Sequence, residues 1–228
     1  MITVTAAVDL RTQFGPVRDQ GDRPTCLAFA ASDAHAACRP AWEMLSSEYA
    51  FFYAQKRAGQ PPDRGTYLEP MLDALRLDGQ PVEQSWPYLS SLPADLASYA
   101  PPATVGEVFR RDGGRRNIGF DTITDTLISG IPVIILMKLT MKFFQPPDQG
   151  IIDYFESDDV FPAPRHAVIA VGYGSTGLSD AILIRNSWGP TWGQGGYAWI
   201  TRAFVEKNLF DMAILTKETD VPNSTAAA

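Results

Sequence analysis

A cysteine and a histidine that could work together as a nucleophile and its base lie far apart in the sequence. Cys26 stands where the turn-like stretch VRDQGDRPT gives way to LAFAASDAHAA, an alanine-rich run that favours a helix. Unpaired amides at a helix N-terminus favour a thiolate, and a nearby imidazole can complete a thiolate–imidazolium pair that attacks carbonyl groups. On this pattern alone, Cys26 can be a small buried hydrophobe, half of a disulfide or a nucleophile.

The sequence contains two histidines that could serve Cys26 as a base. His35 follows Cys26 on the same expected helix, more than about 13 Å further along its axis, so we expect it on the helix surface, out of reach of the thiol. His166 opens the strand-like run HAVIAVGYG after the proline-flanked stretch FPAP. At a strand edge that faces a cleft it can act as base and acid, but taken alone this placement is weak evidence.

A third polar residue follows an apolar strand in the stretch IRNSWGPTWGQGGYAWI. The side-chain oxygen of Asn186 can accept a hydrogen bond from an imidazole N–H and fix the tautomer of the ring. Trp188 can shield such a hydrogen bond from water, which strengthens it. The alternative interpretation is a structural turn whose tryptophans belong to the core.

The elements that must position these residues divide the chain into a helical half and a strand half. We expect helices from Thr25 or Cys26 to about Arg39, after Ser46 and Ser47 with Gly59 as the stop, around the apolar residues of 68–75, and over 121–129. The candidate strands are rich in Val, Ile and aromatic residues: 133–137, 167–173, 181–185, 197–201 and 212–217. The sequence therefore predicts an α+β fold.

Composition excludes several classes of protein. No apolar run approaches the roughly 20 residues of a membrane helix, and a net charge of −7 argues against nucleic-acid binding. A short basic patch over 110–116 is expected to be a solvated loop. Cys26 and Cys38 would lie about 18 Å apart on one helix, too far for a disulfide, and two cysteines fit a reducing compartment.

Three segments together resemble the papain-like cysteine peptidases. The family's segment Q-G-x-C-G-S-C-W-A-F is similar to QGDRPTCLAF, and its histidine and asparagine segments are similar to HAVIAVGYG and IRNSWGPTWGQGGYAWI. His166 and Asn186 follow Cys26 by 140 and 160 residues, near the family's spacing of about 130–150. The resemblance runs from about Ala7 to Lys217. It implies a single peptidase domain over 1–217 with a two-lobed fold: a helical lobe over about 10–110, an antiparallel β-barrel-like lobe over about 111–217 and the active-site cleft between them. Residues 218–228 are expected to be a disordered tail.

The resemblance also implies roles for individual residues. Cys26 matches the nucleophile, His166 the general base and acid, and Asn186 the residue that orients the histidine. Gln20 matches the glutamine whose side-chain amide forms the oxyanion hole with the backbone N–H of Cys26. Trp188 matches the indole that covers the asparagine–histidine contact. No metal or organic cofactor is implied.

Two groups of residues match the substrate site of the family. Gly65, Thr66 and Tyr67 resemble the glycine-rich wall that pairs with an extended peptide. Apolar residues align with the pocket for the second residue before the scissile bond, which predicts an apolar preference there: Leu136, Pro164 and Met212. For all six residues, ordinary core packing is the alternative.

The nucleophile segment departs from the family pattern at three positions. Leu27 replaces a tryptophan, so a wall on the leaving-group side is missing. Arg23 replaces the usual cysteine and Pro24 a glycine, so the disulfide beside the site cannot form. Arg23 is expected to bring a positive charge near the cleft, favouring the thiolate or acidic substrates.

The predicted function is thiol-dependent hydrolysis of peptide bonds through a thioester on Cys26. The alternatives are a transpeptidase or ligase that uses the same thioester, and a non-catalytic peptide-binding module. Expected partners are a peptide or protein substrate and a proteinaceous inhibitor or regulator, with neither nucleic acid nor a membrane span, and the chain is expected to be a monomer. Without a visible pro-segment or signal peptide, we expect a bacterial-type member that is cytoplasmic or a delivered effector, or secreted if the chain has been processed.

Overall fold

The computed structural model describes residues 3–219, which pack into two compact units. Among the described residues, unit 1 contains 3–21 and Arg115–Ile214, and unit 2 contains Asp22–Gly114 and 215–219. Residues 3–21 therefore pack with the strands of the second half. Of the tail expected over 218–228, residues 218 and 219 end the last strand, and the rest lies outside the described residues.

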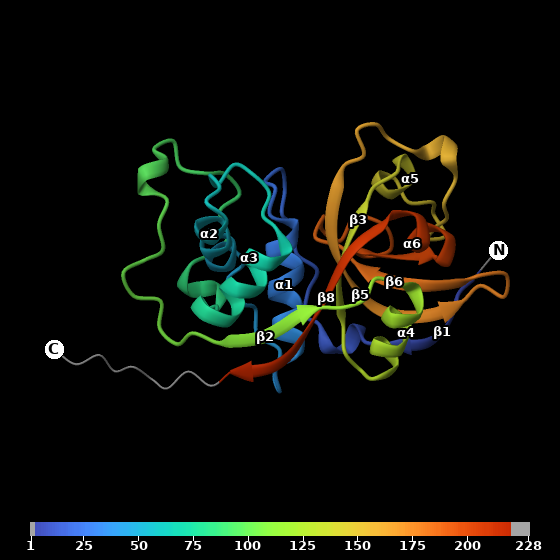
Figure 1. Cartoon of the computed structure of the whole chain (residues 1–228), viewed down its shortest axis with the longest axis horizontal. Coiled ribbons are helices and arrows are strands. Elements are labelled where there is room, and N and C mark those ends of the chain that lie inside the picture. Colours follow the sequence, from blue (N-terminus) through green and yellow to red (C-terminus); the bar gives the residue numbers. More distant parts are fainter. Residues whose placement is uncertain (1–2, 220–228) are drawn as a thin grey trace. The chain divides into compact units, whose positions relative to one another are not determined.

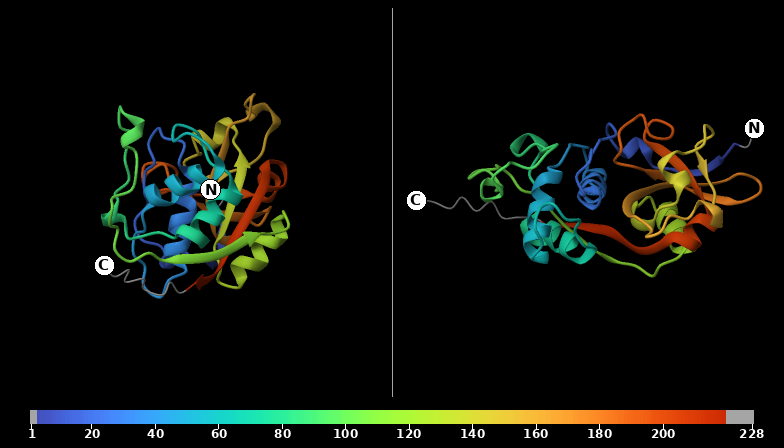
Figure 2. Two further views of the ribbon diagram at one scale, coloured as in Figure 1. Left: turned by 60° about the vertical axis from the view of Figure 1, so that its left-hand side comes forward. Right: turned by 90° about the horizontal axis from the view of Figure 1, so that it is seen from above.

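Unit 2 is built on three helices that contact one another: α1 (Cys26–Ala37), α2 (Ser47–Ala58) and α3 (Leu68–Asp73), the last continued by a π-helical turn over Ala74–Asp78 (Figures 1 and 2). The expected capping signals of α2 are confirmed. The Ser46 hydroxyl accepts from the backbone N–H of Tyr49 at 3.1 Å, and Gly59 ends the helix in the left-handed conformation with φ 61°. Short 3-10 turns follow at Glu83–Ser85 and Leu96–Ser98.

Helix α1 is buried on nearly all sides, and this corrects the expectation for His35. Its alanines present little side-chain bulk, so neighbouring segments can pack against every face of the helix. His35 is 0% exposed, and its Nδ1 lies 3.0 Å from Oε1 of Gln80. Burial lowers the pKa of His35 to about 3, with the hydrogen bond to Gln80 acting in the opposite direction. The predicted surface position of His35 was wrong because the geometry of one helix does not show which segments pack against it.

A mostly antiparallel sheet, most of whose strands lie in unit 1, accompanies the helices, and the α+β class is confirmed. The strand order is β2-β8-β3-β5-β6-β7-β4, with β1 pairing with β5, and only the β4–β7 pair is parallel among the pairings that carry a register in residues 3–219. The described strands form an open path, so the β-barrel-like lobe that the resemblance implied is not closed into a barrel. Their bounds are β1 Thr5–Asp9, β2 Arg110–Arg115, β3 Val133–Lys138, β4 Ile151–Ile152, β5 Arg165–Ser175, β6 Asp180–Arg185, β7 Tyr197–Thr201 and β8 Leu209–Thr219.

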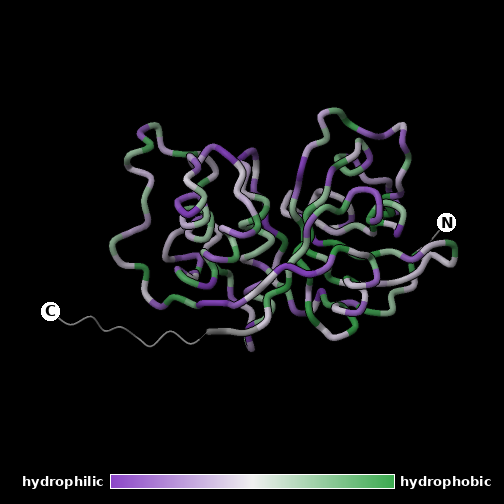
Figure 3. Tube along the Cα trace, in the orientation of Figure 1, coloured by the Kyte–Doolittle hydropathy of each residue, from purple (hydrophilic) through white to green (hydrophobic). Residues whose placement is uncertain are grey.

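The core of unit 1 lies on the side of this sheet that helices cover. Helices α4 (Phe120–Ile128) and α6 (Arg202–Asn208) contact β3 and its neighbours, and α5 (Met141–Phe144) follows β3 directly. A 3-10 turn over Arg11–Gln13 follows β1, and another over Glu156–Asp158 precedes β5. Hydrophobic residues occur along the elements of both units (Figure 3). In unit 2, Trp86 packs with Tyr49 and Tyr99 in a second hydrophobic cluster.

The basic patch over 110–116 is not the solvated loop that the sequence predicted. Residues 110–115 form strand β2, and Arg111 is buried. Thr216 of β8 donates a hydrogen bond from its hydroxyl to the carbonyl oxygen of Asp112 at 3.4 Å. Arginine can take part in a strand because its methylene stem packs on apolar surface while the guanidinium reaches a polar group.

Candidate active site

The sheet brings His166 and Asn186 together in unit 1. His166 is the second residue of β5, and Asn186 follows the last residue of β6, its antiparallel neighbour. The start of one strand and the end of the next therefore meet at the same end of the sheet. The Nε2 atom of His166 lies 2.7 Å from Oδ1 of Asn186. The residues that the sequence singled out as a base and its orienting partner are thus in direct contact.

A backbone amide decides which nitrogen of His166 holds the proton. The N–H of Ser187 donates to Oδ1 of Asn186 at 2.8 Å, so this atom is the amide oxygen and accepts from both sides. In the neutral ring, Nε2 then carries the hydrogen and Nδ1 carries the lone pair. His166 can therefore take up a proton at Nδ1 without breaking its contact with Asn186.

Aromatic rings surround the His166 imidazole. Trp188 lies against it with ring centroids 4.6 Å apart, Phe143 approaches at 5.8 Å, and Phe144 stacks on the outer side of Trp188 at 5.5 Å. His166 is 5% exposed. This burial lowers the pKa of His166 to about 4, and the hydrogen bond with Asn186 acts in the opposite direction. The imidazole is consequently neutral near pH 7, the form that a general base requires.

Gln20 is held beside Asn186 by a residue that the sequence reasoning missed. Residues 18–20 run alongside 187–189: Gln20 N donates to Ser187 O at 2.8 Å, and Gly189 N donates to Arg18 O at 3.1 Å. The hydroxyl of Ser187 donates to Oε1 of Gln20 at 2.7 Å. The carbonyl end of the Gln20 amide therefore faces Ser187, and its NH2 end is turned the other way. The only sequence signal for this role of Ser187 was its position next to the predicted Asn186.

Two glycines shape the turn that follows Asn186. A Cβ on Gly196, whose φ is 89°, would lie 2.4 Å from a side-chain carbon of Val17, and a Cβ on Gly193, whose φ is 55°, would lie 2.4 Å from the carbonyl oxygen of Tyr197. Gly196 also accepts from the backbone N–H of Asn186 at 3.0 Å. The glycines of GQGG thus allow the close backbone approach that places Asn186.

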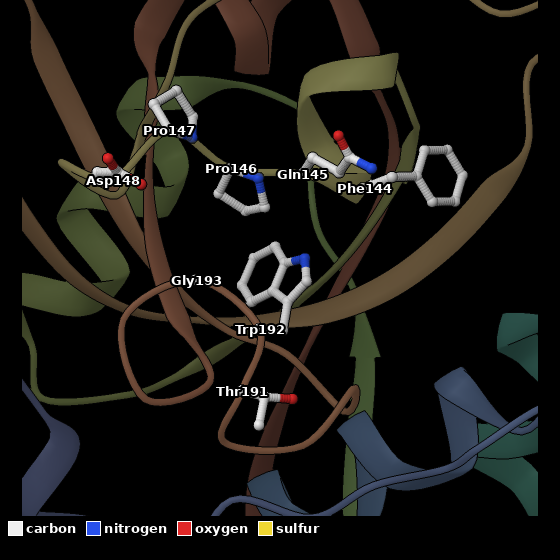
Figure 4. A pocket seen from close by; sticks show the side chains of 8 residues that line it. All are labelled: Phe144, Gln145, Pro146, Pro147, Asp148, Thr191, Trp192 and Gly193. Atoms are coloured by element: carbon white, nitrogen blue, oxygen red, sulfur yellow. The ribbon is translucent and has the colours of Figure 1, made fainter.

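The second tryptophan of this segment is a packing residue that also lines a surface cavity. Trp192 donates from Nε1 to the carbonyl oxygen of Phe143 at 2.9 Å, which fixes the helix that carries Phe143 and Phe144. Its ring borders a cavity of about 430 Å³ (Figure 4). The lining also includes Phe144, Gln145, Pro146, Pro147, Asp148, Thr191 and Gly193.

Unit 2 holds the candidate nucleophile. Cys26 is the first residue of α1, is half-buried, and is present as a thiol, as is Cys38 just beyond the other end of the helix. Thr25 precedes it as N-cap without a side-chain capping bond, and its hydroxyl lies instead 3.0 Å from that of Tyr88. The predicted position of Cys26 at a helix N-terminus is confirmed.

The predicted glycine-rich wall lies in the same unit. Gly65 is exposed, and a Cβ built on it would lie 3.9 Å from the carbonyl oxygen of Pro24, so this wall adjoins the segment that precedes Cys26. The hydroxyl oxygen of Thr66 is buried, whereas the Tyr67 side chain is well exposed. The wall therefore presents a glycine and an aromatic side chain at the surface.

The three residues aligned with a substrate pocket do not share one face. Leu136 of β3 lies opposite Ala167 of β5 and Asp211 of β8, so these three side chains share a face. Pro164 is half-buried and lies before β5, where its carbonyl oxygen accepts from the backbone N–H of Leu139 at 2.9 Å. Met212 pairs with Ile135, is 0% exposed and belongs to the core. The expectation for Met212 is corrected: side chains alternate along a strand, and the residue beside Leu136 is Asp211, which pairs with Arg115 at 3.1 Å.

Comparison with known proteins agrees with this geometry. The family described as papain family cysteine protease matches residues 104–216, a span that includes His166 and Asn186. "Peptidase 1" of the mite Dermatophagoides farinae is 27% identical over 211 residues, which are 87% of this chain and 61% of that protein. Over residues 104–216 the chain is similar to the papain family of cysteine proteases. It spans less than two thirds of the length of that mite relative.

Solved structures place the fold with the papain family as well. Xylellain, a cysteine protease from Xylella fastidiosa, superposes with a TM-score of 0.74 at 20% identity, over 94% of this chain and 87% of that one. The cysteine protease CMS1MS2 of Carica candamarcensis, solved in complex with E-64, gives a TM-score of 0.67 at 26% identity, over 92% and 97%. The mixture of helices and a mostly antiparallel sheet is thus that of the papain family.

Proposed function

We propose that this protein is a thiol-dependent peptidase that hydrolyses peptide bonds through a thioester on Cys26. The observation that carries the proposal is the 2.7 Å contact between His166 Nε2 and Asn186 Oδ1, which leaves Nδ1 as the proton acceptor of a buried, neutral imidazole. A thiol at the N-terminus of α1 and the similarity of residues 104–216 to the papain family support the assignment of Cys26 as the nucleophile.

The reaction proceeds in two steps. His166 accepts the thiol proton at Nδ1, and the Cys26 sulfur forms a bond to the carbonyl carbon of the substrate. The side-chain NH2 of Gln20 and the backbone N–H of Cys26 stabilise the oxyanion, for which one such donor typically contributes a factor of about 10²–10³. His166 then gives its proton to the leaving amine as the C–N bond breaks. Water, deprotonated by His166, cleaves the thioester and restores the thiol.

The substrate assignment concerns the residue two positions before the scissile bond. Leu136 and Ala167 share one face of the sheet, and Pro164 lies just before β5; these apolar residues support an apolar preference. Asp211 stands beside Leu136, but its carboxylate is paired with Arg115, so its negative charge is balanced. An extended peptide would pair its backbone with that of Gly65 and its neighbours, as strands pair in a sheet.

A positional peptide library tests this proposal under reducing conditions, with Cys26→Ala as control. The expected result is cleavage by the natural protein with a preference for apolar side chains at the stated position, and no cleavage by the variant. Cleavage that survives in Cys26→Ala would contradict the role of the thiol, and tight peptide binding without any turnover would favour a binding module. Mass spectrometry with an added amine nucleophile separates hydrolysis from transpeptidation or ligation, since only an amine-capped product indicates the latter.

The proposed function extends to the oligomeric state, the control and the compartment of the protein. We infer that the chain acts as a monomer on peptide or protein substrates and is controlled by a proteinaceous inhibitor or regulator. Two cysteines present as thiols support a reducing compartment, that is, a bacterial-type cytoplasmic or delivered protein. None of the helices within residues 3–219 combines the length and hydropathy that a membrane span requires.

A further inference from the structure

Arg23, three residues before Cys26, forms a buried ion pair. Its guanidinium meets the carboxylate of Glu48 on α2 in a forked arrangement, with Nη1 2.6 Å from Oε2 and Nη2 2.9 Å from Oε1. Arg23 is 6% exposed and Glu48 is 0% exposed. Two charges buried this deeply persist only because each satisfies the other. The expectation that Arg23 offers its positive charge to a thiolate or an acidic substrate is therefore wrong.

The same pair also binds the segment that follows Trp86. Arg23 Nη1 donates to the carbonyl oxygen of Leu89 at 2.7 Å, and the N–H of Leu89 donates to Glu48 Oε2 at 2.9 Å. Tyr99 donates its hydroxyl proton to Glu48 Oε1 at 2.5 Å. One ion pair thus ties three separate segments of unit 2 together: the turn before Cys26, helix α2 and the connection over 88–99.

Aromatic rings confine the guanidinium from several sides. Its central carbon lies 5.4 Å from the ring centroid of Phe51, 5.2 Å from that of Tyr88 and 5.9 Å from that of Tyr99. Tyr88 also contacts the hydroxyl of Thr25, the residue directly before Cys26, at 3.0 Å. The backbone N–H of Thr25 donates to the carbonyl oxygen of Arg23 at 2.8 Å, so the turn leading into α1 is held at both ends.

A pair of this kind is a poor means of stabilising a fold. Replacing a buried ion pair by apolar residues of similar volume is often neutral or stabilising, so stability alone does not account for it. A bidentate guanidinium, by contrast, fixes direction as well as distance. In an enzyme, a shift of about 1 Å at the reacting group can lower the rate about a hundredfold.

We propose that Arg23, clamped by Glu48, is a positioning residue that fixes the turn before Cys26 and thereby the direction of the thiol at the start of α1. The inference rests on the proposed peptidase function and adds to it the device that replaces a covalent link in this turn. Arg23 does not contact the substrate, and its effect passes through the backbone of residues 23–25.

The test compares a variant of this pair with a matched control on the same helix. Arg23→Met/Glu48→Leu removes both charges and leaves no buried charge unpaired. Arg57→Met/Asp78→Leu removes the 2.6 Å pair between α2 and the turn after α3, away from residues 23–25. For each protein, kcat and KM on a peptide substrate are measured, together with the free energy of unfolding in urea. A second readout is the rate of Cys26 alkylation by iodoacetamide, resolved by peptide mapping with Cys38 as internal reference.

The expected result for Arg23→Met/Glu48→Leu is a folded protein whose kcat falls at least tenfold while KM changes less than threefold, and whose Cys26 alkylation slows at least fivefold relative to Cys38. The control pair keeps both rates. Unchanged kcat and alkylation in a folded Arg23→Met/Glu48→Leu protein would overturn the inference.

If the double variant does not fold, Arg23→Lys tests the inference instead. Lysine keeps the charge beside Glu48 but lacks the planar fork, so an intermediate loss in kcat is expected, and full activity would overturn the inference. If the natural protein cleaves no peptide, the proposed function fails. The alkylation rates, which need no substrate, still decide whether Arg23 positions the thiol.

Discussion

The hydroxyl of Ser187 donates a 2.7 Å hydrogen bond to Oε1 of Gln20, two residues that lie 167 positions apart in the sequence. This contact selects the orientation of the Gln20 amide, because the oxygen is held by Ser187 and the NH2 end must point elsewhere. A glutamine without it could turn its amide over. The donor that the proposed mechanism needs is therefore set by a neighbour that takes no part in the chemistry.

Ser187→Ala tests this relationship. A single neutral hydrogen bond contributes about 1 kcal/mol, so kcat is expected to fall about fivefold while KM stays nearly constant. Steady-state kinetics on one peptide substrate measures the effect. In a Gln20→Ala background the same substitution should have almost no further effect, and an additive loss would show that Ser187 acts independently of Gln20.

Asn186→Ala tests the orientation of His166. Without Oδ1 the ring loses the acceptor that holds the hydrogen on Nε2, and the imidazole can turn or adopt the other tautomer. Because general acid–base catalysis contributes about 10²–10⁴-fold, partial loss of it should lower kcat about ten- to a hundredfold. Full activity in the variant would contradict the assigned role. Asn208→Ala, a buried asparagine on α6 that donates to the carbonyl oxygen of Phe204, is the matched control.

The two buried histidines predict how stability depends on pH. The pKa values of His35 and His166 in the folded protein are about 3 and about 4, below their ordinary value of 6.5. Between pH 6.5 and the folded pKa of each histidine, the unfolded chain binds a proton that the folded protein does not. The contribution of each histidine to the free energy of unfolding is therefore complete above pH 6.5. It falls by about 1.4 kcal/mol per pH unit as the pH drops toward the folded pKa.

Urea unfolding at pH 7.5, 6.0 and 5.0 measures this dependence, with His35→Gln as comparison. The variant should lose stability less steeply with acid than the natural protein, because the unfolded chain then has one proton fewer to gain. The comparison isolates His35 from the carboxylates, which titrate alike in both proteins. Parallel pH dependences in the two proteins would show that His35 is not held neutral by the fold.

Arg115→Ala tests the balance of charge beside Leu136. In this variant the Asp211 carboxylate stays on the face of Leu136 and Ala167, but its charge is no longer balanced by Arg115. Activity toward peptides with Lys or Arg two residues before the scissile bond should rise about two- to fivefold relative to Leu, the scale of one exposed ion pair. Arg116→Ala is the control, and Arg115→Ala/Asp211→Asn should return the natural preference.

The sequence reasoning succeeded where local signals decide the structure. Ser46 and Gly59 bound α2 as predicted, because capping depends on a few adjacent residues. The strands that contain 167–173 and 181–185 were also recognisable, since continuous apolar runs are typical of buried strands. These two strands are the elements that bring His166 and Asn186 together.

It failed where packing between distant segments decides. His35 lies on a helix whose burial depends on the segments around it, and Arg111 lies in a strand that a cluster of charges does not suggest. Met212 was predicted for the pocket, but neighbouring residues of a strand point to opposite faces, and the face of Leu136 belongs to Asp211. The contact of Ser187 with Gln20 joins residues 167 positions apart, and the position of Ser187 beside Asn186 was its one local signal.

The proposed mechanism requires a thioester on Cys26 with His166 as its base. The most direct test is mass spectrometry after incubation with a peptidyl epoxide or an acid-quenched peptide ester, followed by peptide mapping. We expect one adduct per chain on the peptide that contains Cys26, formed much more slowly in His166→Ala and absent in Cys26→Ala. Labelling that is equal in the natural protein and in His166→Ala, or that falls on Cys38 instead, would contradict it.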